Sequence, residues 1–157
     1  GITEDRRLIT LAEKVYNNAN LENPIAPSDT AVKLVAFLER CRDEWGFAKD
    51  VYIDNADQAT MTELKKYKRL NNCLYNFWDA YKKLCILDRI KLQLGWIQQG
   101  CYLGVDDCTE HLSELDKYSW KEDKDEPEDK NDHTINASQY SWIPYKKLIG
   151  FEEDNEK

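Results

Sequence analysis

The sequence predicts a layered α/β domain. Short apolar runs rich in β-branched and aromatic residues alternate with longer segments whose apolar residues recur every three or four positions. The first pattern is typical of strands, and the second is typical of helices that pack one face on a core. The alternation of the two favours a sheet covered by helices. With 157 residues and a hydrophobic share of 41%, the chain can build one domain over residues 1–150.

The charge of the chain is unevenly distributed. Its net charge is −8. Residues 121–132 hold three basic and seven acidic side chains, and residues 151–157 hold one and four. We therefore expect 151–157 to be an acidic disordered tail, and the low pI does not exclude a nucleic-acid surface elsewhere.

The cysteines and the hydropathy pattern indicate the class of protein. The five cysteines are irregularly spaced and form no C-x-x-C pair, which favours buried thiols over a disulfide framework or a zinc site. A reducing cytoplasm fits this usage. No apolar run approaches the ~18 residues of a spanning segment, so we expect no membrane partner.

The first half of the chain predicts strand, helix, strand and helix. Residues 7–16 are strand-like, and a loop follows to residue 27. A helix opens at Pro27 with Ser28 or Asp29 as N-cap, and it ends at Gly46. Residues 51–53 form a short strand, and Thr60 with Glu63 resembles the capping box of a helix over 61–70.

Two features of this half carry chemistry. Asp54 follows the strand over 51–53 at its carboxyl end, where it is either a turn residue or a metal ligand. The helix over 61–70 bears a basic face, which is either a solvated surface or a phosphate-contacting patch. The residues of that face are Lys65, Lys66, Lys68 and Arg69.

The second half continues the alternation. We expect a strand over 74–81 with Lys82 and Lys83 after it, a helix over 86–99, and a strand over 101–105. A helix capped by Asp106 and Asp107 follows, then a charged loop over 121–131. A last helix spans 132–142 and is limited by Pro144.

Several of these pieces together resemble the C-terminal nuclease domain of phage or prophage terminase large subunits. The pieces occur in family order along most of residues 1–150. They are YIDNAD (52–57), ELKKYKR (63–69), AYK (80–82), ILDRI (86–90), the strand with Cys108, ELDKYSW (114–120), PED (127–129) leading to NDH (131–133), and NA (136–137) with Tyr140 beyond.

The resemblance implies a ribonuclease H-like fold, a mixed sheet flanked by helices, and two-metal phosphodiester hydrolysis of double-stranded DNA. Two Mg²⁺ or Mn²⁺ ions would be held by clustered acids. Asp54 matches one family acid. The final helix matches the family pattern Asp-His-x-x-Asp-Ala with Asp132, His133 and Asn136, so these residues are the other candidate catalytic or metal-binding positions.

The sequence departs from the family pattern in two ways. Asn136 stands where the family has an acid, and Asp132 could compensate for it. The family's first strand and first acid precede the segment that matches residues 7–16, so the domain is expected to be truncated at its N-terminus. Such a truncation would expose sheet edges.

Three hypotheses follow. The first is a DNA endonuclease domain of a terminase, in which the basic face and Lys82 and Lys83 contact phosphates. The second is a catalytically incomplete DNA-binding or assembly module of the same fold. The third is an unrelated α/β interaction domain whose acids are turn and cap residues. The family resemblance further implies the terminase ATPase region, the small subunit and the portal protein as partners in the cytoplasm of a bacterial host.

Overall fold

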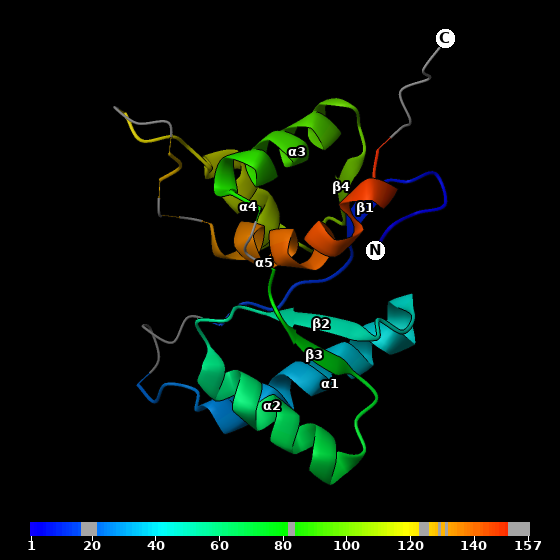
Figure 1. Ribbon diagram of the computed structural model, residues 1–157, viewed down its shortest axis with the longest axis vertical. Helices are drawn as coiled ribbons and strands as arrows, with labels where there is room; N and C mark the ends of the chain where they lie inside the picture. Colours follow the sequence, from blue (N-terminus) through cyan, green and yellow to red (C-terminus); the bar gives the residue numbers. More distant parts are fainter. Residues whose placement is uncertain (17–21, 82–83, 123–125, 129, 131, 151–157) are drawn as a thin grey trace. The chain divides into compact units, whose positions relative to one another are not determined.

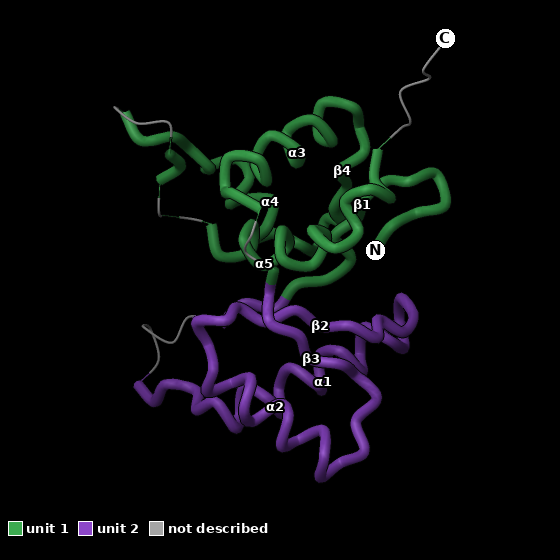
Figure 2. Tube along the Cα trace, in the orientation of Figure 1, with its two compact units in different colours: residues 1–13, 81–157 green, residues 14–80 purple. Residues whose placement is uncertain are grey.

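The chain folds into two compact units. The computed structural model describes residues 1–16, 22–81, 84–122, 126–128, 130 and 132–150. Unit 1 comprises residues 1–13 and 81–157, and unit 2 comprises residues 14–80 (Figure 2). Each unit is described by itself below, with the element labels of Figure 1.

The described part of unit 2 comprises two helices packed on one face of a small parallel sheet (Figure 1). Its elements are α1 (Pro27–Trp45), β2 (Asp50–Ile53), α2 (Gln58–Asn71) and β3 (Asn76–Asp79). β2 pairs with β3 in parallel, and Ile53 lies opposite Asp79. The buried core of unit 2 is formed by Ala31, Val35, Met61, Leu64, Tyr75 and Phe77.

The helices of unit 2 were predicted correctly, but their N-caps were not. Ala26 is the N-cap of α1 and Pro27 takes the first helical position, so Ser28 and Asp29 already lie inside the first turn. α2 begins at Gln58 because the carboxylate of Asp57 accepts a hydrogen bond from the Thr60 N–H (3.1 Å). Thr60 is therefore inside the helix and is not the start of a capping box.

Unit 1 packs three helices and a 3₁₀ turn with a second parallel strand pair. Its elements are β1 (Leu8–Thr10), α3 (Ile86–Gln98), β4 (Tyr102–Gly104), α4 (Thr109–Lys117), α5 (His133–Trp142) and the 3₁₀ helix Ile143–Leu148. β1 pairs with β4 in parallel. The core centres on Trp96 and Trp142, whose rings meet edge to face at 4.8 Å.

The start of α4 is capped from a distant part of the sequence. The Glu13 carboxylate accepts hydrogen bonds from the N–H groups of Glu110 (2.8 Å) and His111 (2.9 Å). Cys108 is the N-cap residue and contributes no side-chain capping hydrogen bond. The prediction that Asp106 and Asp107 cap this helix was wrong.

The sheet differs from the expected one. A single mixed sheet was expected, whereas the described strands form two separate two-stranded parallel sheets. Each strand is also short: of the strand-like residues 7–16, only Leu8–Thr10 form a described strand. The overall α/β class and the alternation of strands and helices are confirmed.

The remaining sequence predictions concern the cysteines, a membrane-spanning helix and the C-terminal tail. Cys101 and Cys108 are buried free thiols, as expected, and Cys85 is exposed. Within the described ranges, no helix combines the length and apolar character needed to cross a membrane. The proposed tail over 151–157 lies outside the described residues, and the boundary of the domain at residue 150 stays a prediction.

Candidate functional site

Asp54 stands at the carboxyl end of β2, as predicted. Its side-chain Oδ1 accepts a hydrogen bond from the Ala56 N–H (2.8 Å), and its backbone oxygen accepts one from the Asp57 N–H (2.9 Å). Asp54 therefore shapes the turn that leads into α2. A carboxylate has a second oxygen and further lone pairs, so this turn is compatible with a ligand role as well.

A second carboxylate lies at the same edge of the unit 2 sheet. Asp79 is the last residue of β3 and the register partner of Ile53, the residue before Asp54. Its Oδ1 lies 3.3 Å from Gln58 Nε2, which also donates to the Asn55 carbonyl oxygen (2.8 Å). Sequence reasoning missed Asp79. The signal was available, because parallel strands bring their carboxyl ends to one edge.

Asp132, His133 and Asn136 lie together at the start of α5, as the helical spacing predicted. Asp132 is the N-cap residue and is only 7% exposed. Its Oδ2 accepts a hydrogen bond from Asn136 Nδ2 (2.8 Å), while His133 Nδ1 lies 3.8 Å from its Oδ1. The imidazole of His133 is 92% exposed. Asp132 is thus a buried carboxylate, and these two partners neutralise little of its charge.

A hydrogen-bond network beside α5 was not predicted. The carboxylate of Glu114 accepts hydrogen bonds from the Thr134 N–H (2.7 Å) and the Thr134 hydroxyl (2.6 Å). The Thr134 oxygen lies 3.1 Å from His111 Nδ1, and His111 Nε2 lies 2.8 Å from the Tyr102 hydroxyl. This network links β4, α4 and α5.

The network fixes the tautomer of His111. Because the Thr134 hydroxyl donates to Glu114, its oxygen accepts from His111 Nδ1–H, and His111 Nε2 accepts from the Tyr102 hydroxyl. His111 is 1% exposed, and burial lowers its pKa. Burial likewise raises the pKa of Tyr102, so both side chains are neutral at physiological pH.

The basic face of α2 has two parts. Lys65 and Arg69 are exposed, as is Lys66, which lies 3.3 Å from Glu63. Lys68 is turned inward: its Nζ donates to the Tyr75 carbonyl oxygen (2.7 Å) and to Asn76 Oδ1 (2.8 Å). Lys68 therefore holds the start of β3 to α2 and is the weakest candidate for a phosphate contact.

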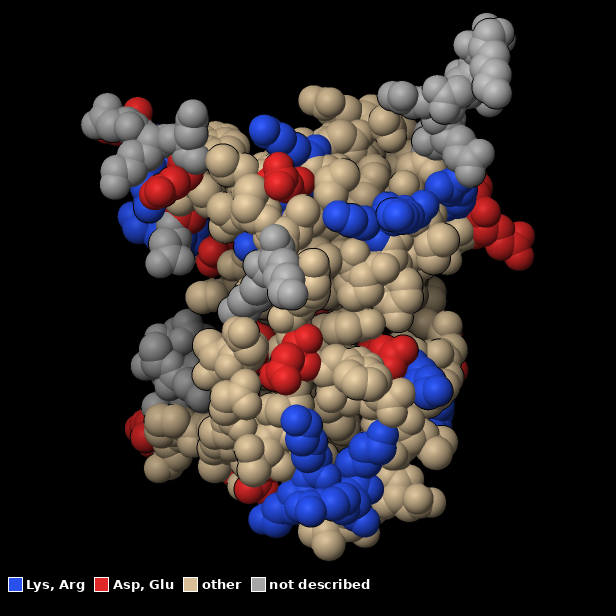
Figure 3. All heavy atoms as spheres, in the orientation of Figure 1, with Lys and Arg blue, Asp and Glu red and all other residues tan. Residues whose placement is uncertain are grey.

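Figure 3 shows that Lys and Arg side chains gather over α2 on one face of unit 2. Exposed cations on one helix face are a suitable surface for phosphates. Lys82 and Lys83, the other predicted DNA contacts, lie outside the described residues.

Among the described residues, the proposed metal ligands occur as a single residue, Asp54, and as a pair, Asp132 and Asn136. No three His, Cys, Asp or Glu side chains gather as a possible metal centre in the part of the chain that the structure describes. Asp132 and Asn136 belong to unit 1, and Asp54 belongs to unit 2. The metal site inferred from the sequence therefore stays a prediction.

Comparison with known proteins gives a fold match only. No family model matches the chain, and no curated protein matches it. Solved structures do match: the fold is similar to that of a large terminase from a thermophilic bacteriophage. With this terminase in complex with ADP, the TM-score is 0.66 at 20% sequence identity. The same terminase in complex with ATP-γ-S gives a TM-score of 0.65 at 21% identity.

The match covers most of this chain but a minor part of the terminase. It spans 83% of the present chain and 31% of the terminase chain. A third structure of that terminase gives the same coverage, with a TM-score of 0.66 at 21% identity. The fold likeness therefore agrees with the expectation of a terminase-like α/β fold.

Proposed function

We propose that this chain is the nuclease part of a terminase large subunit from a bacteriophage or prophage. In this proposal it has a ribonuclease H-like fold and cuts double-stranded DNA during packaging. The observation that carries the proposal is the fold likeness to the phage large terminase over 83% of the chain. The order of acidic and basic motifs along the sequence supports the nuclease assignment.

The proposed metal ligands are Asp54, Asp132 and Asn136. Carboxylate and amide oxygens are the donors that hard divalent cations prefer. A buried carboxylate is costly without a counter-charge; the ion pair that the described residues give Asp132 is the 3.8 Å approach of His133, beside the hydrogen bond from Asn136, and a metal ion would stabilise its charge further. For Asn136 to ligate through its oxygen, its amide would have to rotate away from Asp132 Oδ2.

The metal ions and the protein side chains would have different roles in the reaction. Bound Mg²⁺ or Mn²⁺ ions supply a polarised water and stabilise the leaving oxygen. His133, exposed beside Asp132, would orient a phosphate or a water. Lys65, Lys66 and Arg69 would hold the DNA backbone, with Lys82 and Lys83 as further contacts.

Plasmid nicking in Mn²⁺ tests this proposal. We expect the wild-type chain to nick supercoiled DNA and Asp54→Asn to lose at least about tenfold in rate, since even the loss of a residue that only supports a metal ligand costs roughly 10–100-fold in affinity or activity. Glu44→Gln is the matched control, because Glu44 is an exposed acid of the same unit outside the proposed site. Nicking by Asp54→Asn at the same measurable rate as the wild type would exclude Asp54 as a ligand.

A second candidate function is a catalytically incomplete DNA-binding or assembly module of the same fold. It is favoured by Asn136, which offers no charge and donates its amide hydrogen to Asp132. On this alternative the wild-type chain binds DNA without cutting it, and Asn136→Asp creates Mn²⁺-dependent nicking. If Asn136→Asp changes neither metal binding nor nicking, residue 136 has no ligand role.

The partners implied by a terminase follow only from this proposal. They are double-stranded DNA, the ATPase region of the large subunit, the small subunit and the portal protein, in the cytoplasm of a bacterial host. Of these partners, DNA can be tested first, by a pull-down with the purified chain.

A further inference from the structure

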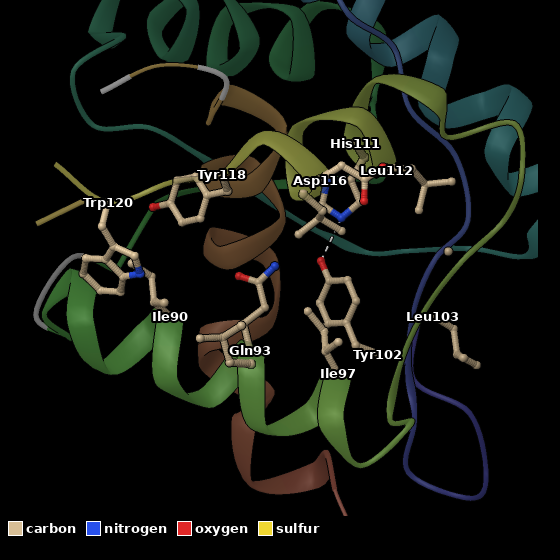
Figure 4. A pocket seen from close by; sticks show the side chains of 13 residues that line it. Ile90, Gln93, Ile97, Tyr102, Leu103, His111, Leu112, Asp116, Tyr118 and Trp120 are labelled. Carbon is tan, nitrogen blue, oxygen red and sulfur yellow. Dashed lines mark hydrogen bonds between the residues drawn. The ribbon is translucent and has the colours of Figure 1, made fainter. Parts of the chain in front are cut away.

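Unit 1 contains a pocket whose lining is not used by the proposed nuclease function. The pocket has a volume of about 630 Å³ and is lined by residues of α3, β4, α4 and the segment that follows α4 (Figure 4). Sites for small molecules in proteins typically measure ~300–1,000 Å³. The pocket is therefore large enough for a ring-containing molecule.

Its walls are largely apolar and partly exposed. Leu94 and Ile97 on α3 are 46% and 42% exposed, and Trp120 is 48% exposed. Removing apolar surface from water makes a favourable contribution to binding. A ligand that covers these three side chains would gain this contribution, and the indole of Trp120 offers a face for a planar ring.

Two buried polar side chains, Gln93 and His111, and the partly buried Tyr102 meet in the pocket. Tyr102 and His111 bond to each other (2.8 Å), and His111 is held by Thr134 on its other side. Gln93, which is 4% exposed, uses its Oε1 to accept a hydrogen bond from Gln139 Nε2 (2.9 Å). Figure 4 shows Gln93 directed into the pocket beside Tyr102.

The amide nitrogen of Gln93 has no acceptor among the residues that the structure describes. Burial raises the pKa of the Tyr102 phenol, and the nearby Gln93 side chain partly opposes that rise. Even so, Gln93 Nε2 reaches no oxygen of the described residues at hydrogen-bonding geometry. The buried hydroxyl of Tyr118, another lining residue, is also without a partner in the described ranges. Leaving a buried donor unsatisfied is unfavourable, and a ligand oxygen would remove that cost.

The charged side chains of the pocket lining favour a neutral ligand, and the buried Arg89, whose charge acts on the lining residue Tyr118, lies outside that lining. None of the described residues that line it is Lys or Arg, and Asp116 is an exposed acid at its edge. Burying an anion next to Asp116, with no cation in the described lining, is unfavourable. A carboxylate or phosphate ligand is therefore disfavoured relative to a neutral carbonyl or amide.

From this geometry we propose that the pocket between α3, β4 and α4 binds a neutral planar aromatic or heteroaromatic molecule whose carbonyl oxygen accepts a hydrogen bond from Gln93 Nε2. Trp120 covers the ring, and Leu94 and Ile97 form the apolar wall. Two sources carry this chemistry: a free small molecule, or an unpaired nucleobase of a nucleic-acid strand.

A series of three probes of similar size tests the ligand chemistry. Benzamide, benzoate and toluene are titrated into the full chain, with the side-chain NH₂ signals of Gln93 followed by NMR. Benzamide should shift these signals and bind about tenfold more tightly than toluene, which lacks an acceptor, and than benzoate, which is charged. Equal affinity for benzamide and toluene, or no shift with benzamide, overturns the proposal.

Two substitutions on neighbouring positions of α3 provide the structural control. Ile97→Trp fills the pocket and should abolish benzamide binding, whereas Gln98→Trp adds the same indole at an exposed position outside the lining. Circular dichroism of both variants shows whether α3 is retained. Benzamide binding to a folded Ile97→Trp protein with wild-type affinity would place the ligand elsewhere and refute the pocket.

Thymidine and a short oligothymidylate separate the two sources. Shifts of the Gln93 signals by the free nucleoside assign a small-molecule ligand, and shifts by the oligonucleotide alone assign a nucleobase. Absence of both shifts overturns the heteroaromatic part of the proposal. These titrations need no metal and no cleavage, so their result is independent of the proposed nuclease activity.

Discussion

His111 shows how one buried side chain can hold several elements of unit 1 together. Its backbone N–H donates to Glu13, and its ring joins Tyr102 on β4 to Thr134 on α5. Each ring nitrogen has one partner, and the chain of donors ends on the carboxylate of Glu114. Protonation of the ring would require the Tyr102 hydroxyl to turn its proton from His111 Nε2 toward the Ser138 hydroxyl oxygen, 3.0 Å away, and burial disfavours the charged imidazole.

The neutral state of His111 predicts a loss of stability in mild acid. Burial lowers the folded-state pKa below the ordinary 6.5, so the unfolded chain binds the proton more readily. The neutral imidazole makes its full contribution to the free energy of unfolding above pH 6.5. This contribution is lost as the pH falls through the folded-state pKa, at no more than ~1.4 kcal/mol per pH unit. Urea unfolding at pH values on both sides of 6.5 measures this loss.

The two histidines of the chain give a matched pair for this experiment. His111→Asn should have a lower free energy of unfolding than the wild type at neutral pH. The difference in free energy between the two proteins should become smaller as the pH is lowered. His133→Asn removes the exposed imidazole and should leave the acid-dependent loss intact. If the His111→Asn curve falls with pH as steeply as the wild type, another group is responsible.

The helix α4 depends on a residue that lies almost 100 positions before it in the sequence. Glu13 follows β1 and caps the N–H groups of the second and third residues of α4 across 97 and 98 residues. A carboxylate at a helix N-terminus is favourable both as an acceptor and as a negative charge near the positive end of the helix dipole. α4 therefore gains its cap from the tertiary fold.

Removing the Glu13 carboxylate should loosen the start of α4. We expect Glu13→Ala to lower the free energy of unfolding by about 0.5–2 kcal/mol, the usual cost of losing a cap. Amide hydrogen exchange of Glu110 and His111 should become faster, since their N–H groups lose their acceptor. Glu4→Ala, at an exposed acid of the same unit, should change stability by less than about 0.5 kcal/mol.

The hydrophobic core of unit 1 gives a second prediction about the helices. Trp142 on α5 is 1% exposed and meets Trp96 on α3 edge to face. Trp142→Ala should cost about 3–5 kcal/mol by leaving a cavity that the helices cannot fill. Trp120→Ala, at a half-exposed indole, should cost much less in urea unfolding, and similar costs for both would contradict the assigned core.

At the scale of the whole molecule, the elements were predictable from the sequence and the contacts between distant segments were not. The periodicity over 27–45 and 86–98 predicted α1 and α3, and Gly46 with a φ of 103° ends α1 as expected. The short β2 was predicted because three apolar residues precede Asp54. These features depend on local propensity and spacing.

The parts that escaped prediction are set by tertiary packing. The cap of α4 by Glu13 joins residues that no local pattern connects. The role of His111 depends on β4 and α5 meeting at one point, and Asp79 became a candidate only once β3 was seen to pair with β2. Asp132 and Asn136, by contrast, were predicted to meet because they are one helical turn apart.

The net charge of −8 sets the last prediction. A uniformly acidic protein repels DNA, so binding by this chain requires that its cations act locally. Lys65, Lys66 and Arg69 provide such a local surface on α2. Replacing all three by Ala should weaken DNA binding and reduce the slope of log affinity against log salt by roughly 0.9 for each phosphate that is no longer neutralised.

A variant with the same change in net charge separates a local surface from a general charge effect. Lys33, Arg40 and Lys49 are exposed cations of unit 2 outside the basic face of α2. Their joint replacement by Ala should leave the salt slope close to that of the wild type, although it makes the protein equally more acidic. Fluorescence anisotropy with a DNA duplex at several salt concentrations measures both slopes. Equal reductions for the two variants would mean that α2 is not the DNA-binding face, because only the total charge would then matter.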